Sequence, residues 1–168
     1  MIDALRQNKN ISIILAVLRV YLGYTWFVAG WGKITSGGFD ASGFLQGALA
    51  KTTGENPTVQ EWWGVFLKNA AIPNIEVINI LVPWGELFVG LGLLIGCFTK
   101  TAVFFGIVMN FSYMFSGTTS TNPQLVLLSM FILVSAMNAG RYGLDGMLMP
   151  TLKEKLFVNK TRQIKDAA

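Results

Sequence analysis

Apolar residues are concentrated in four runs along the chain, separated by segments that hold most of the polar side chains. The runs cover about residues 11–31, 77–98, 101–118 and 123–140. At about 1.5 Å per residue, a helix over either of the first two runs is roughly 30 Å long, the thickness of a bilayer's hydrocarbon core. The pattern predicts an all-α integral membrane four-helix bundle with a long first loop.

The first two runs each contain one charged residue near the middle, Arg19 and Glu86. Ionisable groups at this depth are expensive and usually functional. Measured along the predicted helices, Arg19, Glu86 and Asn110 fall within about 6 Å of a common level, and a guanidinium can bind a carboxylate through two hydrogen bonds. Three alternatives follow. Arg19 and Glu86 form a contact that stabilises the packing of the helices, or they belong to a ligand site, or Arg19 extends to the cytoplasmic membrane interface while Glu86 is protonated and neutral.

The first loop, of about forty residues, is not plain linker sequence. Two apolar clusters, in 39–49 and 62–67, flank the polar segment 52–57. Such clusters are typical of short helices at the outer membrane interface, with Trp62 and Trp63 at the level of the headgroups. A lid over a pocket that opens outward is the alternative.

The basic residues predict the orientation of the helices. Nine of them fall before the first run, between the second and third, or after the fourth, whereas only three fall in the first loop. The positive-inside rule then places both termini in the cytoplasm, with a basic tail at 150–168 and the first loop outside. We expect a single multi-pass domain, residues 1–168, in the bacterial cytoplasmic membrane. Arg19 interrupts the apolar core that a cleavable signal peptide would need.

Composition narrows the chemistry. Of the 168 residues, 52% are hydrophobic and 13% are charged, which favours a lipid environment over nucleic-acid binding. Cys97 is the sole cysteine and the chain has no histidine, so an internal disulfide, a thiol pair, axial histidine ligation of haem and most zinc or copper sites are excluded. We expect no metal and no covalent cofactor. Any redox centre would be a diffusible molecule such as a quinone, or would belong to a partner.

Small residues mark faces on which helices can pack closely. Gly92 and Gly96 form a small-xxx-small pair in the second run, and Arg19, Gly23, Trp26 and Gly30 share a stripe of the first run. Arg19 is therefore expected to face protein. The glycines would also suit the docking of partner helices.

Three short motifs together resemble a known family. They are Leu18-Arg19-x-x-Leu22-Gly23 with Gly30-x-Gly32-Lys33, then Gly96-Cys97-Phe98-Thr99-Lys100 at the end of the Glu86 run, and the terminal Gly140-Arg141-Tyr142-Gly143-Leu144-Asp145. In order and spacing they are similar to the DoxX/DoxD family of small four-helix bacterial membrane proteins, over roughly residues 11–147. The polar positions Arg19, Lys33, Glu86, Arg141 and Asp145 match the family pattern.

The resemblance implies a membrane subunit of a quinone-linked oxidoreductase system, acting in thiosulfate or sulfur, thiol or quinone-stress chemistry. No catalytic residue is assigned. The candidate residues for a quinone headgroup or a small sulfur anion are Arg19, Glu86 and Asn110, with aromatic walls from Trp26, Trp84 and Tyr113. Expected partners are the lipid bilayer and either further copies of the chain or other membrane or peripheral subunits. The alternatives are a non-enzymatic scaffold or assembly protein and, third, a small transporter.

Overall fold

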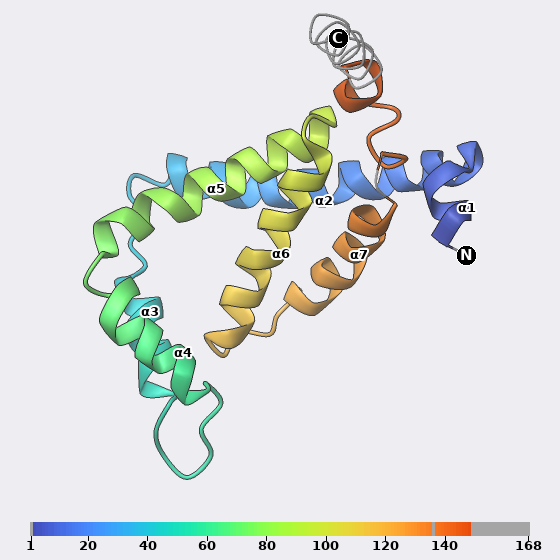
Figure 1. Ribbon diagram of the computed structural model, residues 1–168. Coiled ribbons are helices and arrows are strands. Elements are labelled where there is room, and N and C mark those ends of the chain that lie inside the picture. The colour runs from blue at the N-terminus through green and yellow to red at the C-terminus, as the bar shows by residue number, and fades with distance from the viewer. Residues whose placement is uncertain (1, 136, 149–168) are drawn as a thin grey trace, which may run out of the picture.

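The computed structural model describes residues 2–135 and 137–148, and in this part every regular element is a helix (Figure 1). The all-α prediction is confirmed there. The predicted basic tail at 150–168 lies outside the described residues. The elements are α1 (Ile2–Gln7), α2 (Lys9–Thr35), α3 (Ser42–Ala50), α4 (Glu61–Phe66), the π-helical turn η1 (Leu67–Ala71), α5 (Ile75–Ile95), α6 (Thr99–Phe115) and α7 (Asn122–Val134).

Two of these helices, α2 with 27 residues and α5 with 21, are long and apolar enough to cross a membrane. They lie side by side, and the α6–α7 pair runs obliquely to them (Figure 1). Helix α6 has 17 residues and α7 has 13, which is shorter than the roughly 20 residues of a full span. The predicted four-span bundle therefore stays a prediction, whereas the packing of four long helices around one apolar core is observed.

Glycines set the register between α2 and α5. A Cβ added to Gly23 would lie 2.7 Å from the backbone N of Leu94, and one added to Gly30 would lie 2.7 Å from the carbonyl oxygen of Pro83. A Cβ on Gly90 would overlap the backbone of Phe27. The two antiparallel backbones thus touch along their length, as small residues allow in membrane proteins.

The ends of two helices differ from the sequence prediction. Helix α2 continues to Thr35, past the last residue of the first apolar run. Helix α7 ends at Val134 instead of about 140, where the Ser135 hydroxyl donates to the carbonyl of Ile132. Beyond it, the Asn138 amide donates to the carbonyls of Leu5 and Asn8 at 2.9 and 3.0 Å. After Val134 the chain thus runs toward the junction of α1 and α2, and α7 does not continue to residue 140.

Residues 41–74, here called the cap segment, contain the short helices α3, α4 and η1 that the two apolar clusters predicted. The segment has a small core of its own, and it joins the N-terminal end of α5 to the C-terminal end of α6 (Figure 1). The backbone N–H of Ala41 donates to Asn79 of α5 at 2.8 Å, and the indole N–H of Trp63 donates to the Ser116 hydroxyl beside α6 at 2.9 Å. The location of this segment at the outer membrane interface stays a prediction.

Candidate functional site

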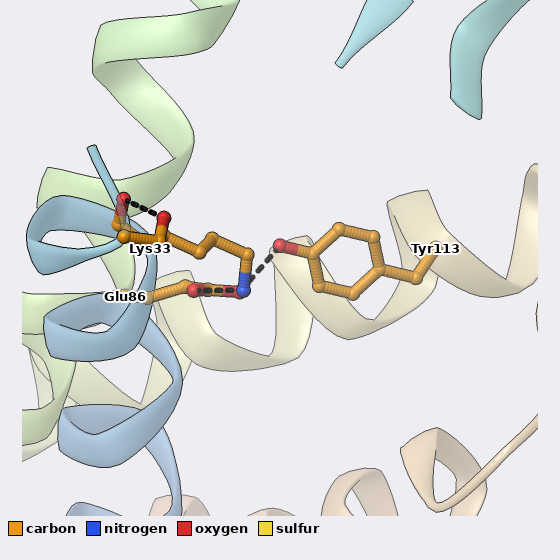
Figure 2. Close-up of polar contacts among 4 residues, drawn as sticks. Lys33, Glu86 and Tyr113 are labelled. Atoms are coloured by element: carbon orange, nitrogen blue, oxygen red, sulfur yellow. Dashed lines mark hydrogen bonds and ion pairs between the residues drawn. The ribbon is translucent and has the colours of Figure 1, made fainter. Parts of the chain in front are cut away.

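A polar network lies where α2, α5 and α6 meet (Figure 2). The carboxylate of Glu86 on α5 is 3% exposed, and its Oε2 lies 2.6 Å from the ammonium Nζ of Lys33 on α2. The hydroxyl of Tyr113 on α6 donates to the other oxygen, Oε1, at 2.7 Å. Each helix therefore contributes one side chain, and both carboxylate oxygens are hydrogen-bonded.

Lys33 was assigned from the sequence only as a family-motif position, and the structure makes it the ion-pair partner of Glu86. Because α2 runs on to Thr35, Lys33 sits in its last turn, where a cation also favours the C-terminal end of the helix dipole. Its ammonium lies 5.8 Å from the centroid of the Phe39 ring, and its side chain is 29% exposed. Lys33 thus links the buried carboxylate to the protein surface.

The network faces a large apolar groove between α5 and α6. The groove has a volume of about 1090 Å³ and is closed at one end by the cap segment. Lys33, Glu86 and Tyr113 all line it. Other lining residues come from α5 (Gly85, Phe88, Gly92 and Ile95), from α6 (Thr101, Phe105 and Met109) and from the cap segment (Phe44, Trp63 and Phe66). A few convergent polar groups in an apolar concavity are the usual features of a small-molecule site.

Asp40 lies on the rim of this groove, just before α3. The Ser42 hydroxyl and backbone N–H donate to its Oδ1 at 2.6 and 2.9 Å. These hydrogen bonds, the hydroxyl's first, lower the pKa of Asp40 below its ordinary value. The rim of the groove therefore carries a negative charge at neutral pH.

Arg19 and Glu86 do not pair, contrary to the sequence-based hypothesis. The Arg19 guanidinium is 2% exposed and donates from Nη1 to the carbonyl of Leu93 at 2.9 Å and from Nη2 to that of Tyr142 at 3.0 Å. The α2–α5 register explains the separation. It places Glu86 opposite the end of α2 and Arg19 opposite the end of α5, roughly 18 Å away at 1.5 Å per residue.

Asp145 lies at the α5–α6 turn, at the same end of the molecule as Arg19. Its two carboxylate oxygens accept the backbone N–H groups of Phe98 and Thr99, each at 2.8 Å, where α6 begins. A carboxylate at this position satisfies orphan donors and complements the helix dipole. Arg141 donates to the side chain of Asn138 at 3.4 Å. Arg19 and Asp145 together hold the segment after α7 against the α5–α6 turn. Both residues therefore have a structural role.

None of the remaining candidates makes a described hydrogen bond to Glu86. Asn110 is fully buried, and neither its amide nitrogen nor its oxygen has a hydrogen-bond partner among the described residues. Trp26 packs in the core of the bundle, and its indole N–H is also without such a partner. Trp84 is 46% exposed and lies against Phe88. Of the three predicted aromatic walls, only Tyr113 reaches the carboxylate.

Comparison with known protein families supports the resemblance over the first two of the three motifs, those in 18–33 and 96–100. The profile of the DoxX family matches residues 14–119, a range that includes Arg19, the Lys33–Glu86–Tyr113 network and most of the groove. No curated protein and no solved structure gives a significant match. The matched range covers more than half of the chain and contains all of α5 and all but the first five residues of α2, the two helices that are long enough to cross a membrane. The chain belongs to the DoxX family of membrane proteins.

Proposed function

We propose that the chain is the quinone-binding membrane subunit of an oxidoreductase system and that the quinone headgroup binds at the Lys33–Glu86–Tyr113 network. The observation that carries this proposal is the buried, fully hydrogen-bonded carboxylate facing an apolar groove. An ion pair is a poor way to stabilise a protein in a medium of low dielectric constant, because desolvation offsets most of the attraction. A ligand that uses these groups gives a reason for their position.

The chemistry of the network matches that of a quinone. A quinone is a flat apolar ring with two carbonyl oxygens, and each oxygen takes up a proton when the ring is reduced. Lys33 has further N–H donors beyond the one on Glu86, and the Tyr113 hydroxyl keeps free acceptor capacity. Glu86 is the group that can accept or release a proton beside the ring. In this proposal the residues hold the headgroup, and Glu86 relays to it a proton taken from the solvent on the exposed side of Lys33.

The electrons in this proposal come from another subunit or a diffusible donor. The chain has no histidine and a single cysteine, which leaves few ways to hold a metal centre or to relay electrons through thiols. The family resemblance implies that the complete system acts on sulfur compounds, thiols or toxic quinones. The partner subunit would bind them.

The proposed location is the bacterial cytoplasmic membrane, with both termini in the cytoplasm and the cap segment outside. Nine basic residues on one side against three on the other support this orientation. Lys33 and the end of the groove that the cap segment closes would then lie toward the outer face of the membrane.

The scaffold alternative loses the feature that suggested it. Gly92, expected to receive a partner helix, lies against Ala102 of the same chain, and an added Cβ would be 3.0 Å from the Cβ of that alanine. Gly96 has φ of +70° and lies against the Arg19 guanidinium. The small residues are used for packing within the chain.

The test is a ligand-dependent melting experiment on the purified protein in detergent. A ligand at one hundred times its dissociation constant stabilises the folded state by about 2.7 kcal/mol, so menaquinone and ubiquinone analogues should raise the melting temperature. Tyr113→Phe removes one hydroxyl and should weaken this shift, whereas Tyr21→Phe, at an exposed position of α2, should not. If no quinone shifts the wild type, the proposal fails. If the shift survives unchanged in Tyr113→Phe, the headgroup does not bind at this network.

A further inference from the structure

The groove continues well beyond the polar network that occupies one part of it. From Glu86, it follows α5 past Gly92 to Ile95, and on α6 it extends from Tyr113 to Thr101. The nine residue steps from Glu86 to Ile95 correspond to roughly 14 Å of helix. Its volume of about 1090 Å³ exceeds that of most pockets for drug-sized ligands, which are about 300–1,000 Å³. A quinone headgroup would fill only part of this space.

The lining changes character along the groove. Near the cap segment it includes the charged side chains of Lys33, Asp40 and Glu86 and the hydroxyl groups of Tyr113 and Ser116. Toward the α5–α6 turn its lining is mainly apolar, with Phe88, Gly92, Ile95, Ala102 and Phe105, and Thr101 contributes a hydroxyl group. A ligand that fits this gradient has a polar end and a long hydrocarbon end.

We infer that the ligand is a long-chain isoprenoid quinone whose chain lies between α5 and α6 and points from Glu86 toward the α5–α6 turn. This inference rests on the proposed function, because it takes the headgroup site as given. The headgroup is then on the side of the cap segment. The isoprenoid chain of the quinone supplies most of the apolar area that binding buries, and hence most of the affinity.

The exposed residues along the groove support a chain that enters from the lipid. Phe88, Ile95 and Phe105 are each at least half exposed, although they border the groove. A hydrocarbon chain can therefore slide in sideways from the bilayer, without passage through water or through the cap segment. An acyl chain of a bulk phospholipid has the same apolar chemistry and is the competing occupant that the experiment must separate.

The experiment compares a long-chain menaquinone with menadione, which has the same ring and no chain. Binding is measured in wild type, in Thr101→Trp, which fills the far end of the groove, and in Leu127→Trp, which places the same side chain on an exposed site of α7 outside the groove. Partitioning of the quinones into detergent is the same for all three proteins, so differences between them report on the groove.

We expect wild type and Leu127→Trp to bind the long-chain quinone at least about tenfold more tightly than menadione. Thr101→Trp should lose that advantage and bind menadione as well as wild type does. If neither quinone binds wild type, the proposed function itself fails. If both bind with equal affinity, or if Thr101→Trp leaves the advantage intact, the headgroup site stands and the placement of the chain is overturned.

A second measurement covers the case in which Thr101→Trp does not fold. A menaquinone with a photoreactive group at the end of its chain is crosslinked to wild type, and the labelled peptides are identified by mass spectrometry. Labels near Thr101 and Ile95 support the inference, and labels confined to the cap segment contradict it. Excess phospholipid that abolishes the crosslink while menadione still binds would assign the far groove to a lipid acyl chain.

Discussion

Glu86 Oε2 lies 2.6 Å from Lys33 Nζ, and this ion pair joins the middle of α5 to the last turn of α2. The two groups differ in their access to solvent, since the Lys33 side chain is 29% exposed and that of Glu86 is 3% exposed. The difference has a consequence for mutagenesis. A lone Lys33 can be hydrated, whereas a lone Glu86 carboxylate has the Tyr113 hydroxyl as its only remaining described hydrogen-bond donor.

The first prediction concerns the asymmetry of this pair. Lys33→Met should cost about 3–5 kcal/mol of unfolding free energy unless Glu86 takes up a proton, because it leaves a buried charge unpaired. Glu86→Gln should cost less, and the double variant should cost less than the two single losses together. Thermal unfolding in detergent measures all three, with Lys68→Met on the exposed side of η1 as the control. Simple additivity of the two losses would show that the side chains do not interact.

The second prediction concerns the α2–α5 contact. Gly90→Ala should destabilise the protein by about 1–3 kcal/mol, because the added methyl group would overlap the backbone of Phe27 and force the helices apart. Gly32→Ala is the matched control, since nothing lies within 4 Å of its added Cβ and alanine is the better helix former. It should stabilise α2 by up to about 1 kcal/mol. Equal effects of the two substitutions would contradict the observed register.

Much of the fold could be predicted from the sequence, because length and hydropathy act locally. The two full-length apolar helices and the short helices around Leu45 and Trp63 follow from runs of apolar residues bounded by polar ones. The ends of the helices were harder to predict. The last apolar residue of the first run is Trp31, but the helix extends beyond it, and the end of α7 depends on the distant contact of Asn138 with Leu5.

The candidate site was predicted only in part, for a related reason. Glu86 and Tyr113 were both identified, but the cation was taken to be Arg19 when it is Lys33. The choice depends on how far α2 is shifted along α5, and glycine contacts at Gly23 and Gly90 determine that shift. No periodicity in one helix reveals its register against another. A lysine two residues beyond the apolar run was the available signal, since a helix in a membrane often extends into the interface.

The third prediction concerns orientation. With both termini in the cytoplasm, the exposed turn at Thr53 faces the outside. In a Cys97→Ser background, Thr53→Cys should react with a membrane-impermeant thiol reagent added to whole cells. A cysteine introduced at Lys153 should react only after the cells are permeabilised. Labelling at position 153 in intact cells would contradict the proposed topology, although it would not bear on the helix packing.

The fourth prediction separates the two polar sites. Arg19→Lys keeps the charge but loses the planar fork that reaches the carbonyls of Leu93 and Tyr142, so it should lower the stability of the fold by about 1–3 kcal/mol. Arg141→Lys, at an exposed position, is the control. Because Arg19 lies roughly 18 Å from the level of Glu86 along the helices, the melting shift caused by a quinone should be the same in Arg19→Lys as in wild type. Tyr113→Phe should show the opposite result, with a smaller ligand shift. An Arg19→Lys protein of normal stability that no longer responds to quinone would move the headgroup site from the Lys33–Glu86–Tyr113 network to the α5–α6 turn.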